Sequence, residues 1–130
     1  MGSPPGPNYG FRCELAEILG IKVEDLPVAF RGSVVALKDG AFKELRARYP
    51  GADPHALADF EHRYTTSYRY VRKIIYGRSL HDIDGKTIQL IGRRRRRRAR
   101  FMLRHVPEDR LGMPQKFATN RCVESVATNR

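Results

Sequence analysis

The spacing of apolar residues predicts an N-terminal helix, a short strand and then a group of helices. Apolar positions over residues 11–19, with Glu14 and Glu17 on the opposite side, indicate an amphipathic helix that Gly20 ends. The β-branched run at residues 33–38, followed by Asp39-Gly40, predicts a strand. Because no second strand precedes the next helices, we expect this strand to pair with its copy in another subunit, which predicts a homodimer.

The central third of the chain predicts three helices. An apolar stripe of Phe42, Leu45 and Tyr49 marks the first helix, which Pro50-Gly51 ends. Asp53 followed by Pro54 is typical of an N-cap and a first helical residue. The second helix therefore covers residues 55–64, and its expected inward side chains are Leu57, Phe60 and Tyr64.

A polar turn at residues 65–67 separates the second helix from a third that ends before Gly77. Val71, Ile74 and Ile75 form its apolar stripe, and at 100° per residue Arg69 and Lys73 lie opposite. Two helices joined in this way are typical of a helix-turn-helix that places its second helix in the DNA major groove. Thr66 and Ser67 are the expected phosphate ligands at the helix start. The expected DNA-reading side chains are Tyr68, Arg69, Arg72 and Lys73, of which Arg72 and Lys73 could equally bind phosphate; a merely basic, solvated helix is the alternative.

The net charge of +11 is concentrated in one segment of the sequence. Residues 1–85 have a net charge of +1, whereas residues 86–104 contain nine basic and no acidic side chains. Such a block suits a polyanion, because each phosphate contact releases counterions. We therefore add the arginine tract to the candidate DNA-binding residues: Arg93, Arg94, Arg95, Arg96, Arg97 and Arg98. A solvated tail or a localisation signal is the alternative.

These observations predict a mainly α fold with four parts. Residues 1–12 are an expected disordered leader, and residues 13–40 a dimerisation module of one helix and a short strand. Residues 41–78 form the helix-turn-helix domain. Residues 79–130 form a basic, mostly irregular extension with one possible strand at residues 87–91. The apolar residues of the second part are either dimer interface, which we favour, or intrachain core: Leu15, Ile18, Leu19, Leu26, Phe30, Val34, Val35 and Leu37.

Neither cysteine nor histidine spacing indicates a metal or catalytic site. We expect Cys13 and Cys122 to be free thiols in a reducing cytoplasm. His81, Asp82 and Asp84 are interpreted as loop or capping residues. We therefore predict no catalysis and no cofactor, and the absence of a long apolar run predicts no membrane span.

The order of these parts resembles the Mor/C family, the middle- and late-operon transcription activators of Mu-like phages. The resemblance covers roughly residues 13–78. It rests on residues 15–20, then Ala29-Phe30-Arg31-Gly32, residues 34–38, residues 42–49 with Gly51, and the two-helix unit at residues 60–75. It implies a dimer, a helix-turn-helix that binds duplex DNA at a site with dyad symmetry, and contact with host RNA polymerase.

The predicted function is therefore a sequence-specific transcription activator of phage or prophage genes, cytoplasmic and associated with the nucleoid. A structural, ribosome-associated RNA-binding protein that uses the arginine tract is the alternative. A phage packaging or recombination factor is a third possibility, because those proteins also contain helix-turn-helix modules.

Overall fold

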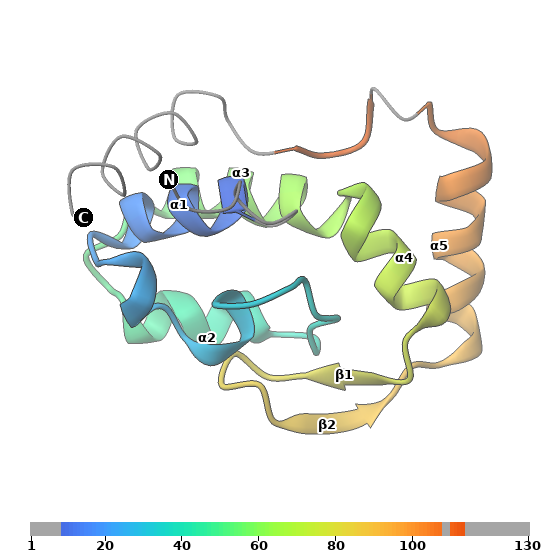
Figure 1. The fold of residues 1–130 in the computed structure, drawn as a ribbon, viewed down its shortest axis with the longest axis horizontal. Coiled ribbons are helices and arrows are strands. Elements are labelled where there is room, and N and C mark those ends of the chain that lie inside the picture. The colour runs from blue at the N-terminus through green and yellow to red at the C-terminus, as the bar shows by residue number, and fades with distance from the viewer. Residues whose placement is uncertain (1–8, 108–109, 114–130) are drawn as a thin grey trace, which may run out of the picture.

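The computed structural model describes residues 9–107 and 110–113, and this part of the chain is mainly helical, as predicted (Figure 1). No helix in it has the length and apolar character needed to cross a membrane. The elements in chain order are α1 (Tyr9–Leu19), η1 (Val23–Asp25), η2 (Val28–Phe30), α2 (Ala41–Arg48), α3 (Pro54–Thr65), α4 (Tyr68–Tyr76), β1 (Ser79–His81), β2 (Thr87–Leu90) and α5 (Arg93–His105).

The residues predicted to begin and end these helices are confirmed. Gly20 follows α1 with a φ of 72°, and Ile21 donates back to the carbonyl of Ala16, which closes the helix in a Schellman-type turn. The Asp53 carboxylate accepts the N–H of His55 at 2.9 Å, and Pro54 begins α3. α2 covers the stripe predicted from Phe42 and Leu45.

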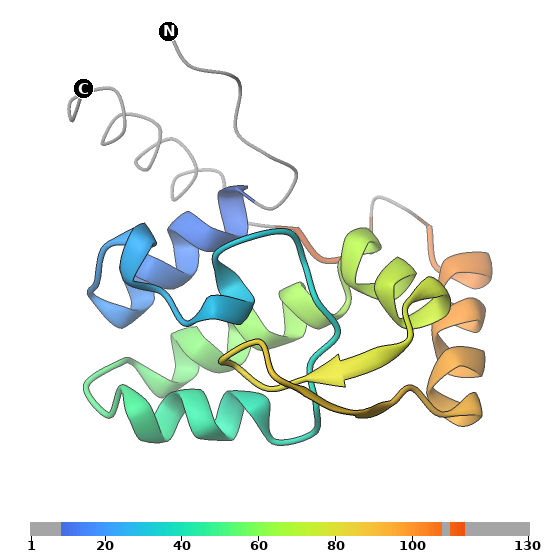
Figure 2. The ribbon, with the colours of Figure 1, turned by 60° about the horizontal axis from the view of Figure 1, so that its bottom comes forward.

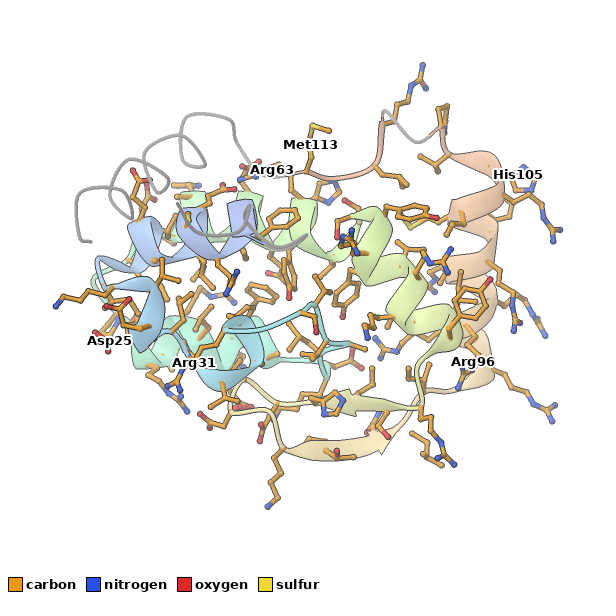
Figure 3. The ribbon with its side chains drawn as sticks, in the orientation of Figure 1. Asp25, Arg31, Arg63, Arg96, His105 and Met113 are labelled. Carbon is orange, nitrogen blue, oxygen red and sulfur yellow. The ribbon has the colours of Figure 1, made fainter. Side chains whose placement is uncertain are left out.

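α1 lies alongside α3, and a buried ion pair joins them (Figure 2). Glu14 is 3 % exposed, and its carboxylate accepts hydrogen bonds from both terminal nitrogens of Arg63, one of them at 2.7 Å. Hydrogen bonding to Glu14 raises the pKa of Arg63. Arg63 also donates to the carbonyl of Met113 at 3.1 Å, so the segment after α5 returns to α3 (Figure 3).

The prediction of a regular strand at residues 33–38 is wrong. Only Leu37 forms a bridge, to His81 in parallel orientation. Lys38 donates to the carbonyl of His81, and His81 donates to the carbonyl of Ala36, each at 2.8 Å. The backbone partner of this segment is therefore β1 of the same chain, and the unpaired strand no longer argues for a dimer. The sequence reading missed β1 because a three-residue strand has almost no periodicity.

One hydrophobic core crosses the boundary predicted at residue 40. The Tyr64 ring packs against five other aromatic rings, with centroid distances of 5.3–6.3 Å. Those rings belong to α1, η2, α2, α3 and α4: Phe11, Phe30, Phe42, Phe60 and Tyr70. The N-terminal residues thus share their core with the two-helix unit.

The predictions of a leader over residues 1–12 and an irregular extension from residue 79 are wrong within the described residues. α1 begins at Tyr9. β1 and β2 form an antiparallel hairpin, which confirms the strand predicted near residues 87–91. The arginine tract lies in α5, which packs against α4 (Figure 1). Residues 1–8 and 114–130 lie outside the described part.

The prediction of two free thiols is also wrong, because Cys13 is disulfide-bonded. Cys122, the other cysteine of the sequence, lies outside the described residues. The inference from free thiols to a reducing cytoplasm therefore falls away.

The aromatic core predicts a large penalty for truncating its centre. Tyr64→Ala should lower the free energy of unfolding by roughly 3–5 kcal/mol, as for other large aromatic side chains removed from a core. Urea denaturation followed by circular dichroism measures this change. His62→Ala, at an exposed position of the same helix, is the control and should stay within about 0.5 kcal/mol. Equal effects of the two substitutions would contradict a core centred on Tyr64.

Candidate nucleic-acid interface

The start of α4 is capped from inside the protein. The Ser67 hydroxyl accepts the N–H of Tyr70 at 3.3 Å and donates to the carbonyl of Tyr64 at 2.7 Å. Ser67 is only 4 % exposed, and the Thr66 hydroxyl donates to the carbonyl of His62. Both hydroxyl groups donate within the turn, so the contact with phosphate predicted at this position stays a prediction that would depend on the backbone N–H groups. The two hydroxyl groups satisfy backbone groups at the junction of α3 and α4.

The segment after α5 covers the same turn. Gly112 donates its N–H to the carbonyl of Thr66 at 3.2 Å. A Cβ at this position would lie 1.9 Å from the Arg63 carbonyl oxygen, so only glycine allows the backbone this close. The turn between α3 and α4 is therefore fixed both by its own hydroxyl groups and by the segment that follows α5.

One face of α4 is anchored in the core. Val71, Ile74 and Ile75 are buried, as predicted, together with Tyr70. The Tyr70 hydroxyl accepts the N–H of Leu37 at 3.1 Å, and burial raises its pKa. Tyr70 is thus a packing residue of the core.

The opposite face of α4 is exposed and contains no acidic side chain. It consists of Tyr68, Arg69, Arg72, Lys73 and Tyr76. Tyr76 is 71 % exposed and Tyr68 39 %, although both are large aromatic residues. The structure therefore brings together all four base-reading candidates and adds Tyr76. Together with Ser33 and Val34, from the loop between η2 and α2, this face lines a hollow of about 370 Å³.

Arg72 is held between the two exposed tyrosines. Its guanidinium carbon lies 5.5 Å from the ring centroid of Tyr68 and 5.0 Å from that of Tyr76. Arg72 also donates to the Tyr68 hydroxyl at 3.1 Å. These contacts orient the guanidinium by cation–π attraction and a hydrogen bond. Arg69 and Lys73 have no such contact among the described interactions, and both are exposed.

The arginine tract divides into internal and external residues. Arg95 pairs with Asp39 at 2.9 Å. Arg96 donates to the carbonyls of Ile75 and Gly77, at 2.7 and 2.9 Å, where α4 ends (Figure 3). A cation at this point also complements the helix dipole of α4. The remaining arginines of α5 are exposed: Arg93, Arg94, Arg97, Arg98, Arg100 and Arg104.

The sequence reading missed the helix that contains the arginines. The signal was the spacing of Ala99, Met102 and Leu103, which stand at positions i, i+3 and i+4 and pack toward the core. Arginine itself favours helix. Nitrogen-tipped side chains extend from α5 on the side away from α4 (Figure 3). Positive charge is therefore displayed on two neighbouring helices.

The predicted dimer residues belong to the intrachain core. Leu15, Leu26 and Phe30 are at most 1 % exposed, and Leu19, Val34 and Leu37 are also buried. Ile18 and Val35 are partly buried against the same core. These side chains are therefore covered within a single copy of the chain.

Asp82 has the capping role predicted for it. Its carboxylate accepts the N–H groups of Asp84 and Lys86 and so closes the hairpin turn. Asp84 pairs with Arg48 at 2.8 Å, which lowers the pKa of Asp84. His81 lies in β1 and donates its backbone N–H to the carbonyl of Ala36.

Comparison with protein-family models, with curated proteins and with solved structures finds no match to this chain.

The contact between α5 and α4 predicts a stability role for one arginine of the tract. Arg96→Ala should lower the free energy of unfolding by about 1.5–3 kcal/mol, the range for lost hydrogen bonds to a charged group. Arg97→Ala, its exposed neighbour, is the matched control and should change stability by less than about 0.5 kcal/mol. Thermal or urea unfolding distinguishes them. If Arg97→Ala proved as harmful as Arg96→Ala, the assignment of Arg96 to the end of α4 would be wrong.

Proposed function

We propose that this protein binds duplex DNA, with α3 and α4 as a helix-turn-helix and the exposed face of α4 in the major groove. The observation that carries the proposal is the two-sided character of α4. Four residues anchor one face in the core, while Arg69, Arg72 and Lys73 project from the other without a neighbouring acid. A helix with this division presents cations at fixed positions, as base reading requires.

The dimensions of α4 suit the groove. Its nine residues span roughly 13 Å, and the major groove of B-DNA is about 12 Å wide. Arg69 is the proposed base reader, because a free guanidinium can bond both acceptors of a guanine. Arg72, already oriented by Tyr68 and Tyr76, is the proposed phosphate ligand.

The exposed arginines of α5 support the same proposal. Figures 1 and 2 place α5 beside α4, and α5 contains six exposed arginines. These groups add affinity that depends on salt and not on sequence. Their role is to strengthen binding, while α4 supplies the discrimination.

The biological role that we propose is transcription activation of phage or prophage genes, as a homodimer that contacts host RNA polymerase. This part rests on the resemblance of residues 13–78 to the Mor/C activators. The fold is consistent with it in having a capped pair of helices joined by a short turn.

Structural RNA binding through α5 is the second candidate. One observation favours it: α5 combines its exposed arginines with Phe101, which is 62 % exposed and packs against His105 with ring centroids 4.3 Å apart. Exposed aromatic and guanidinium planes are the groups on which unpaired RNA bases stack. Under this alternative, α5 is the binding element and α4 its support.

Arg69→Ala tests the proposed base reading. Duplexes selected from a random library by the parent protein provide the specific probe, and an unrelated duplex provides the non-specific one. The substitution should weaken binding to the selected duplex by roughly 5- to 150-fold, the equivalent of 1–3 kcal/mol, and affect the unrelated duplex far less. Fluorescence anisotropy measures both. Equal losses on the two duplexes would contradict base reading by Arg69.

A second variant separates α4 from α5. Replacing Arg93, Arg97, Arg100 and Arg104 by glutamine leaves Arg95, Arg96 and the packing residues of α5 in place. DNA binding should weaken for every sequence and its salt dependence should fall by up to about four phosphate contacts, with the selected sequence still preferred. Loss of RNA binding with unchanged DNA binding would instead favour the second candidate.

A further inference from the structure

β2 is an open edge of the sheet. One side of β2 pairs with β1, and the far side of β1 is bridged by Leu37. No strand lies on the outer side of β2 among the residues that the structure describes. An edge of this kind presents backbone N–H and C=O groups that can pair with another strand.

β2 lacks two features that often protect an edge strand, charge and proline, although it is only four residues long and its pairing with β1 is irregular at Ile88. Its residues, Thr87, Ile88, Gln89 and Leu90, include no charge and no proline, and all four are exposed. Leu90 is 75 % exposed and Ile88 43 %. Gln89 pairs with the fully buried Leu80, so by alternation Leu90 lies on the face turned away from the core. No residue in the described part of the chain covers these apolar side chains.

The charges at the two ends of β2 are opposite in sign. The hairpin turn before β2 contains Asp82, Asp84 and Lys86, a net charge of −1, whereas Arg93 and Arg94 follow β2 at the start of α5. The hydrogen bond from Arg48 keeps the pKa of Asp84 low, so this carboxylate is ionised at neutral pH. Antiparallel pairing of two identical β2 strands therefore brings the acidic end of each copy to the basic end of the other.

We propose that two copies of this chain form a dimer by antiparallel pairing of their β2 edges about a two-fold axis at Gln89. In this register Ile88 of each copy lies opposite Leu90 of the second copy. Each such apolar cross-strand pair contributes roughly 0.2–1 kcal/mol. The hairpin turn of each copy then lies near the start of α5 in the second copy, where their opposite net charges favour this antiparallel arrangement over a parallel one.

This inference rests on the homodimer in the proposed function and names its surface. It replaces the surface expected from the sequence, since Leu15, Leu26 and Phe30 are covered within one chain. A dimer joined at β2 has one α4 in each copy, so two recognition helices are related by the two-fold axis. A DNA site with dyad symmetry matches such an arrangement.

Sizing the full-length protein tests the surface directly. Analytical ultracentrifugation over a concentration series should show a dimer for the parent chain in the absence of DNA. The double variant Ile88→Lys/Leu90→Lys should raise the dimer dissociation constant by roughly tenfold or more, because it removes the apolar pairs and opposes like charges. Phe101→Lys, an equally exposed apolar site on α5, is the matched control and should leave the dimer unchanged.

A cysteine cross-link tests the register. Gln89→Cys places two thiols opposite each other on the two-fold axis, so mild oxidation should produce a covalent dimer on a non-reducing gel. Thr87→Cys is the control, because its two copies would lie about 13 Å apart, beyond disulfide reach. The parent chain, oxidised in the same way, shows whether its own cysteines form a cross-link.

Three results would overturn the inference: a monomeric parent chain, a dimer that the double lysine variant leaves intact, or more efficient cross-linking through residue 87 than through residue 89. A different occupant of the edge, such as another segment of this chain, would appear as a monomer. Failure here is separable from failure of the proposed function. A monomer whose DNA preference depends on Arg69 loses only the β2 dimer, and a β2 dimer without DNA binding loses only the function.

Discussion

The packing of aromatic rings around Tyr64 is the constraint on which the rest of the structure depends. Tyr64 lies near the end of α3 and contacts rings from α1, η2, α2 and α4 as well as its neighbour Phe60. Because aromatic side chains bury large areas in defined geometries, these contacts set how α4 leaves α3. The capping bonds of Ser67 then hold the turn between them. The direction of the basic face of α4 follows from this packing.

The two ends of α4 are fixed by different parts of the chain. The side chains on its exposed face therefore start from a backbone that is held in place. The segment at Gly112 covers the N-terminal turn, and Arg96 of α5 binds the carbonyls at the C-terminal end. A site on a rigid element holds its side chains within a narrower range than a site on a loop. α5 therefore serves two roles, since Arg96 stabilises the end of α4 while the outer arginines of α5 remain exposed.

Local sequence signals predicted α1 to α4 and the exposed residues of α4 well, whereas α5 was missed. The capping residue Asp53 and the apolar stripe of Val71, Ile74 and Ile75 act over one or two helical turns and can be read from a single chain. The other errors concern contacts between residues that are far apart in the sequence. The partner of the segment before Lys38 lies more than 40 residues away in β1, and periodicity does not reveal it. Burial of Ser67 under Gly112 and capping by Arg96 likewise depend on contacts between distant segments.

The most direct measurement is an NMR titration of isotope-labelled protein with duplex DNA selected from a random library. The proposed function predicts that amide and side-chain shifts change most at Tyr68, Arg69, Arg72, Lys73 and Tyr76, with smaller changes along the outer side of α5. Changes confined to α5, or changes produced by RNA and not by duplex DNA, would contradict it.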